Sequence, residues 1–176
     1  MSKLVLLSSM RSLGLLFVLL LLSASLLMLE GCGKSTEQKV AEERLNAQVM
    51  KLHEHLMEDM AEIRDLNAAI DIELANHDRL ALQYPKDLAG RTADDLISAR
   101  KMLLAAKSEM TKWISGYRPY DSSMNHDTVM TKLSSDTEAL RDIQKSIESA
   151  KNTANGAIES HRQLSEKVAA AHPGKR

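Results

Sequence analysis

The sequence has few of the residues that break helices or build β-sheets. Its 176 residues include seven glycines, three prolines, one Trp, three Tyr and one Phe. A fold with many turns uses glycine and proline at those turns, and strands are rich in aromatic and β-branched residues. The chain length suits one domain, so these low counts predict a small number of long helices.

A large excess of either charge is also missing. Lys and Arg number 23 and Asp and Glu number 24, which gives a formal net charge of −1. Nucleic-acid binding needs a basic surface that displaces counterions from phosphates, so this balance argues against a nucleic acid as partner. The sequence contains no G-x-S-x-G, HExxH, P-loop or glycine-rich fingerprint. We therefore expect that the protein is not an enzyme.

Long apolar runs are absent except at the N-terminus. Lys3 and Arg11 precede an uncharged apolar segment, Leu13 to Leu29. A positive region followed by an apolar region is typical of an export signal. The uncharged run from Ser12 to Leu29 has 18 residues, which is at the short end of what spans a bilayer, so a single-pass anchor is the alternative.

Cysteine occurs once, as Cys32, directly after the apolar run. The stretch Leu29 to Cys32, LEGC, resembles the lipobox of bacterial lipoproteins, although Glu30 stands where a small residue is usual. The resemblance implies cleavage before Cys32, diacylglycerol on its thiol and acylation of the new amine. Acyl chains hold a protein at a membrane by about 0.8 kcal/mol per buried methylene. We expect residues 1–31 to be a signal peptide and residues 32–39 to be the lipidated cysteine and a polar tether.

The residues around the cysteine also predict the location of the protein. In the best-known lipoprotein sorting scheme, an Asp after the cysteine retains the protein at the inner membrane, and here Gly33 follows it. No acidic run comes next, which favours the periplasmic face. The expected location is therefore the cell envelope, at the periplasmic face of the outer membrane. The expected partners are the membrane, through the lipid, and another envelope protein or a second copy of the chain.

Apolar residues at steps of three and four predict long helices. The first begins near Thr36, a candidate N-cap, and its pattern fades near residues 76–77 before Pro85 breaks the chain. The second follows Pro85 and ends at Gly116, because Pro119 forbids continuation.

The third segment has the most regular pattern. Its apolar residues keep a heptad rhythm from Val129 to Val168, with Asp136 and His161 as the polar members. Residues 40–172 are thus expected to form an all-α, elongated up-down-up three-helix bundle or coiled coil, followed by a basic tail at residues 173–176. The outer helices should be about 60 Å long and outrun a middle helix of about 30 residues, an overhang that a dimer could cover.

Three segments, residues 47–66, 105–121 and 139–154, resemble a family of small helical lipoproteins common in Bacteroidota. This family is often labelled viral A-type inclusion protein, a label that reflects coiled-coil similarity and not function. The pattern maps onto Met50, His53, Met57, Met60, Met110, Trp113, Tyr117 and Pro119. Ile114 stands where the family has a second Met, and residues 77–89 resemble an insertion. The resemblance implies a helical lipoprotein of unknown activity and carries over no catalytic residue.

Methionine is abundant, with ten residues in the chain. Thioethers and imidazoles are the ligands that Cu(I) accepts, and the cell envelope is where copper stress is handled. The candidate ligands form helical stripes, and they are Met50, His53, Met57, Met60, Met110, His126 and Met130. Copper is therefore a possible cofactor, in a metal-binding or envelope-stress protein. The other explanation is that the methionines fill a helical core, with Trp113 as an aromatic partner and His53 bonded to a carboxylate.

Most of the aromatic residues gather at the second bend. Trp113, Tyr117, Arg118 and Tyr120 lie within eight residues. Trp, Tyr and Arg are the residues that most often anchor protein interfaces, so this corner is a candidate interaction site. The alternative is an apolar lid over the end of the bundle.

Overall fold

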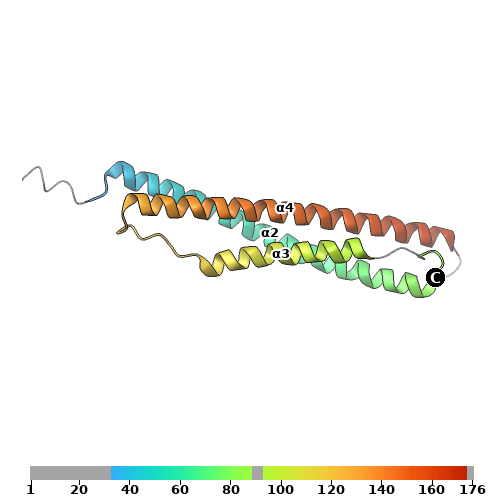
Figure 1. Ribbon diagram of the computed structural model, residues 1–176. Coiled ribbons are helices and arrows are strands. Elements are labelled where there is room, and N and C mark those ends of the chain that lie inside the picture. The colour runs from blue at the N-terminus through green and yellow to red at the C-terminus, as the bar shows by residue number, and fades with distance from the viewer. Residues whose placement is uncertain (1–32, 89–92, 174–176) are drawn as a thin grey trace, which may run out of the picture. The chain divides into compact units, whose positions relative to one another are not determined.

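The computed structural model describes residues 33–88 and 93–173 of the chain. These residues divide between two compact units, residues 1–39 and 40–176. The described part forms three helices and no strand: α2 (Thr36–Gln83), α3 (Asp94–Gly116) and α4 (His126–Ala171) (Figure 1). The predicted all-α fold is thus confirmed. The predicted signal peptide, Cys32 and residues 174–176 of the tail lie outside the described residues.

The first helix starts at a capping box. The Ser35 hydroxyl accepts a hydrogen bond from the Gln38 amide at 3.1 Å, and the Gln38 side-chain oxygen accepts one from the Ser35 amide at 2.9 Å. This reciprocal pair satisfies two of the amides that a helix start leaves free. The N-cap is therefore Ser35, and Thr36, the predicted cap, is the first residue of the helix.

α2 and α4 each bury a column of side chains spaced by seven residues. In α2 the column is Glu42, Val49, Leu56, Ile63, Ile70 and His77, and all six are buried. In α4 it is His126, Leu133, Leu140, Ile147, Ala154, His161 and Val168, of which only His126 is half-buried. A strict seven-residue repeat is the period of a left-handed coiled coil, so one seam can stay inside along the whole helix.

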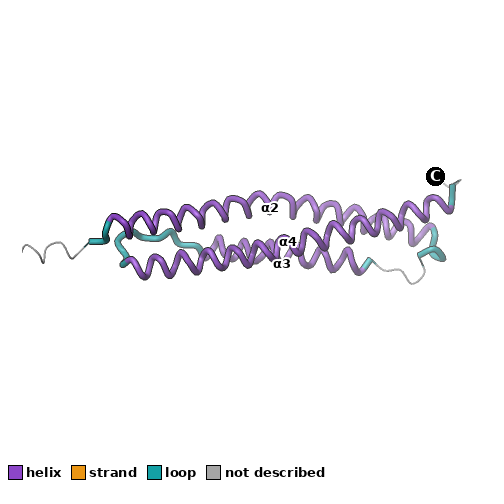
Figure 2. Tube along the Cα trace, turned by 90° about the horizontal axis from the view of Figure 1, so that it is seen from above, coloured by secondary structure: helices purple, strands orange, loops and turns teal. Residues whose placement is uncertain are grey.

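Within residues 40–176, α2 and α4 run parallel to each other and α3 runs antiparallel to both (Figures 1 and 2). This is the predicted up-down-up order. At 1.5 Å per residue, α2 and α4 (48 and 46 residues) are about 70 Å long, and α3 (23 residues) is about 35 Å long. The prediction that the outer helices outrun the middle one is confirmed, although all three lengths differ from the expected values.

Two further details of the predicted helices were wrong. The first helix does not fade near residues 76–77, because His77 is buried and continues the seven-residue column to the end of α2. The third helix does not bury Asp136 in its seam. Thr137 is the buried residue there, at 8% exposure, and its hydroxyl donates to the Leu133 carbonyl at 2.8 Å. Asp136 lies at the seam's edge and pairs with Lys132 at 2.6 Å.

The core has two parts. A large cluster runs along all three helices, and a small one of Leu80, Tyr84, Leu88 and Val168 closes the end near the C-termini of α2 and α4. Among residues 33–88 and 93–173, no helix combines the length and the apolar character needed to cross a bilayer. The two clusters are separated along the seam by a polar layer.

Candidate functional site

This polar layer is a cluster of ionisable side chains between α2 and α4. It consists of Glu73 and His77 from α2 and His161 and Arg162 from α4. Glu73, His77 and His161 are 5%, 8% and 6% exposed, so three titratable groups are buried together. Buried ionisable groups are rare unless they are paired. His77 and His161 are inside the bundle because they belong to the buried seven-residue columns of the two helices.

His161 lies at the centre of this Glu73–His161 cluster. Its Nδ1 is 3.0 Å from Glu73 Oε2, and its Nε2 is 3.2 Å from His77 Nδ1. Arg162 Nε donates to the other oxygen of Glu73 at 3.1 Å. A carboxylate only accepts, so Nδ1 of His161 carries the hydrogen and, in the neutral pair, His77 Nδ1 donates to His161 Nε2. The hydrogen-bonding chain thus fixes one tautomer for each ring.

Glu73 is kept ionised by its hydrogen-bond partners. Burial raises the pKa of Glu73, but the hydrogen bonds from His161 and Arg162, together with their charges, lower this pKa by more. The net result is a pKa below the ordinary value of a glutamate. Glu73 therefore stays ionised under mildly acidic conditions and remains an acceptor for both neighbours.

Two further polar pairs join α2 to α4. Near the start of α4, His126 Nδ1 is 3.0 Å from Glu42 Oε1, and Glu42 is only 2% exposed. Midway along the seam, Lys151 Nζ is 2.7 Å from Asp59 Oδ1 and 2.5 Å from Glu62 Oε2. Burial lowers the pKa of Lys151, but hydrogen bonds to the two carboxylates and their charges raise this pKa by more, to above its ordinary value.

Replacing Lys151 by Met is expected to lower the free energy of unfolding by about 2–3 kcal/mol at pH 7, because the largely buried Asp59 carboxylate loses its counter-ion. A raised lysine pKa contributes stability that is fully present below about pH 10.5 and is lost as pH rises through the folded-state pKa. The difference between wild type and variant in urea unfolding should therefore shrink towards the alkaline end of a series from pH 7 to 12.

Lys145→Met is the matched control. Lys145 pairs with Asp142 on the same helix at 2.7 Å, but its side chain is 76% exposed. Its replacement should change the free energy of unfolding by no more than about 0.5 kcal/mol at any pH. An equal loss for the two variants would show that burial of the Lys151 pair contributes nothing.

The seven predicted copper ligands are placed in different surroundings. Met110 is fully buried in the core, whereas Met50 and Met57 are exposed, and Met60 and Met130 are half-buried. His126 is paired with Glu42, and His53 packs its ring 5.5 Å from that of Trp113. In the described part of the chain, no group of three or more His, Cys, Asp or Glu side chains is arranged to hold a metal ion. Copper binding through methionine stays a prediction.

The aromatic corner bridges all three helices. The Trp113 ring lies between His53 of α2 and Tyr117, whose ring centroid is 4.8 Å away, and Lys132 of α4 lies 5.0 Å from the centre of the Tyr117 ring. Trp113, Tyr117 and Tyr120 are half-buried against the core, as a lid over the bundle would be. A groove of about 350 Å³ remains between α3 and α4 beside Trp113 and Tyr117.

Arg118 is the exposed member of this corner. Its guanidinium donates to the carbonyl oxygens of Ser115 and Tyr117, at 3.1 and 2.9 Å, and so covers the end of α3. Of the four predicted interaction residues, three therefore pack onto the bundle and one binds the backbone. Their role in binding a partner stays a prediction.

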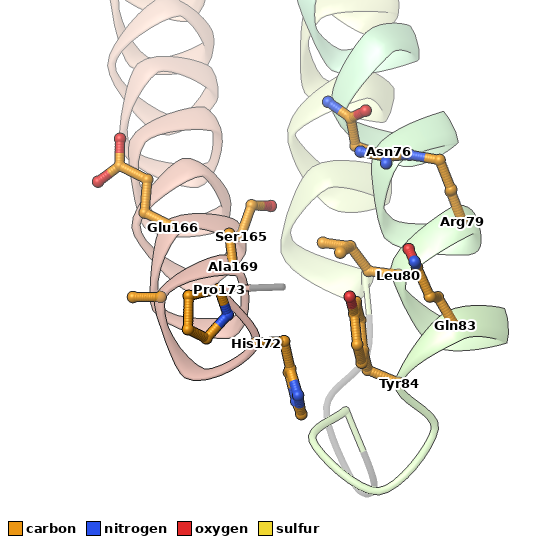
Figure 3. A pocket seen from close by; sticks show the side chains of 11 residues that line it. Asn76, Arg79, Leu80, Gln83, Tyr84, Ser165, Glu166, Ala169, His172 and Pro173 are labelled. Carbon is orange, nitrogen blue, oxygen red and sulfur yellow. The ribbon is translucent and has the colours of Figure 1, made fainter. Parts of the chain in front are cut away.

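A cleft of about 810 Å³ opens between the C-terminal ends of α2 and α4 (Figure 3). The rings of Tyr84 and His172 stack across it, with centroids 4.3 Å apart, and His172 Nε2 is 2.8 Å from Asp87 Oδ2. Asn76 and Ser165, which line the cleft, lie directly beside the Glu73–His161 cluster, since Asn76 precedes His77 and Ser165 donates to the His161 carbonyl at 3.0 Å.

Sequence reasoning identified His161 as a polar seam residue but missed Glu42, Glu73 and His77. A signal for two of them was present. The seven-residue column from Val49 to Ile70 extends to Glu42 on one side and to His77 on the other. The partners of Glu42, Glu73 and His77 lie 84 to 88 residues further along the chain. The sequence pattern of one helix does not show which residues of another helix lie opposite.

Comparison of the chain with models of known protein families, with curated proteins and with solved structures finds no match in any of the three.

Proposed function

We propose that this chain is a lipid-anchored lipoprotein of the bacterial cell envelope, at the periplasmic face of the outer membrane. In this proposal the helical bundle is a structural or binding module and not an enzyme. The observation that carries the proposal is the stretch Leu29 to Cys32, with its lone cysteine after an apolar run. α2 begins at Thr36, so an anchor at Cys32 is followed almost at once by the helix.

The pairing of the buried ionisable residues with one another supports a non-catalytic role. An active site needs reactive groups that converge on a pocket and remain available to a substrate. Here the buried carboxylates are already paired: Glu73 accepts hydrogen bonds from His161 and Arg162, and Glu42 pairs with His126. The family resemblance supports a helical lipoprotein, and the aromatic corner around Trp113 offers the side chains that protein interfaces favour.

Expression of the full chain in a bacterium that processes lipoproteins tests this proposal. Intact-mass measurement of the membrane fraction should show a chain that lacks residues 1–31 and carries a diacylglyceryl group and an amide-linked acyl chain on Cys32. Cys32→Ser should retain residues 1–31 and carry no lipid. A wild-type chain that reaches the membrane with residues 1–31 still attached would replace the lipid anchor by the single-pass alternative.

A further inference from the structure

We propose that Glu73, His77, His161 and Arg162 form a proton-operated latch that holds the C-terminal ends of α2 and α4 together at neutral pH and releases them in mild acid. This goes beyond the proposed lipoprotein function and does not depend on it. The latch rests on three features: the number of protons the two rings accommodate, the charges around them, and the small amount of apolar packing beyond them.

The two rings accommodate one added proton but not two. In the neutral pair, His77 Nδ1 donates to His161 Nε2 across 3.2 Å. A first proton on His161 Nε2 is accommodated when His77 changes tautomer, so that His161 donates both to His77 and to Glu73. A second proton leaves two N–H groups facing each other across the same short gap, on two cationic rings. Closure of the helices at this point therefore opposes binding of the second proton.

The surroundings do not neutralise a doubly protonated pair. Glu73 is the carboxylate bonded to it, and Glu73 already shares its charge with Arg162. The acids Asp78 of α2 and Asp94 and Asp95 of α3 are exposed, and no hydrogen bond joins them to either ring in the described part of the chain. At the cleft, Arg79 and Glu166 are exposed on its two sides and Asp87 is engaged with His172. Separation of the helices exposes both imidazole rings to water, which stabilises the added charge.

Little apolar surface resists this separation. Beyond the Glu73–His161 cluster, the end is closed by the small core cluster of Leu80, Tyr84, Leu88 and Val168, and the 810 Å³ cleft already parts the two helices there (Figure 3). The large cluster lies on the other side of the polar layer. Release is therefore confined to this end. The test therefore compares neutral pH with mild acid.

Spin labels across the cleft test the latch. Gln83 and Glu166 are exposed and line its two sides, so each can be replaced by a labelled Cys in the full chain, with Cys32→Ser and in detergent micelles. Pulsed electron–electron distance measurements should give one short distance at pH 7.5 and a growing population of longer distances at pH 5.5. If release takes up one proton, the open-to-closed ratio rises by up to about tenfold per pH unit. Glu73 remains ionised in this range because its pKa is lowered.

Three controls isolate the pair. His77→Gln keeps a side-chain amide opposite His161 but removes the second cation, so the distance should stay short at pH 5.5. His126→Gln removes the half-buried histidine near the start of α4 and should leave the acid response unchanged. Labels at Gln48 and Arg141, exposed on either side of a groove nearer the N-terminal ends of the same two helices, should report no change with pH. An unchanged distance across the cleft in wild type, or an acid response that persists in His77→Gln, would overturn the proposal.

Discussion

The Leu103→Ala variant is expected to lose about 3–5 kcal/mol of its free energy of unfolding. Leu103 is fully buried at the middle of α3, the helix with the fewest core residues. Its buried set is Leu96, Ala99, Leu103, Ala106 and Met110. Two of these five are alanines, so Leu103 supplies much of the apolar contact with α2 and α4. Its truncation removes that contact and leaves a cavity that long, stiff neighbouring helices do not close.

Leu104→Ala is the matched control, because the neighbouring leucine is 49% exposed on the same helix. Urea unfolding followed by circular dichroism should show a loss of less than about 1 kcal/mol for Leu104→Ala. Trp113, near the C-terminal end of α3, reports whether this helix detaches before the α2–α4 pair does. Equal losses for the two variants would show that α3 is not held by its buried face.

The Glu73→Leu variant is expected to lose about 3 kcal/mol at pH 7. The substitution leaves the buried His161 Nδ1–H without an acceptor and removes the counter-ion of Arg162, although Arg162 is 55% exposed and finds water. A lowered carboxylate pKa contributes stability that is present above about pH 4.5 and is lost as pH falls through the folded-state value. The difference between wild type and Glu73→Leu should therefore shrink on acidification below pH 4.5.

Two variants make this measurement specific. Glu73→Gln keeps an oxygen that accepts from His161, so it should lose less than half as much as the leucine variant. Glu43→Leu changes an exposed glutamate on the same helix and should alter stability by no more than about 0.5 kcal/mol. If Glu73→Leu is no less stable than Glu43→Leu at pH 7, the buried pairing contributes nothing to the fold.

The three helices were predictable from the sequence because one physical signal, the apolar repeat, decides both where a helix forms and which face it buries. The errors came from positions where local chemistry and the repeat disagree. Residues 76–77 are polar and suggest a helix end, but the seven-residue column continues through His77. Asp136 and Thr137 are adjacent, and only the phase of the supercoil decides that Thr137 is the one inside.

The candidate site was predictable only in part, for a different reason. A sequence shows that His161 lies on the seam of its own helix, but not which turn of another helix lies opposite. Glu73 and His161 are 88 residues apart, and their contact depends on how far α4 is shifted along α2. The aromatic corner was easier, because Trp113, Tyr117 and Tyr120 are close in the chain and meet at one bend.

The spacing of the polar pairs has a consequence for how the chain selects one alignment. Glu42 and His77 lie five heptads apart, as do His126 and His161, so both pairs form in the same register. If α4 slipped by one heptad, the apolar columns would still match, but His161 would face Ile70 and Lys151 would leave Asp59. Each misplaced group would cost about 1–5 kcal/mol, since it would be buried without a partner. The apolar seam tolerates several registers, and the polar pairs exclude all but one.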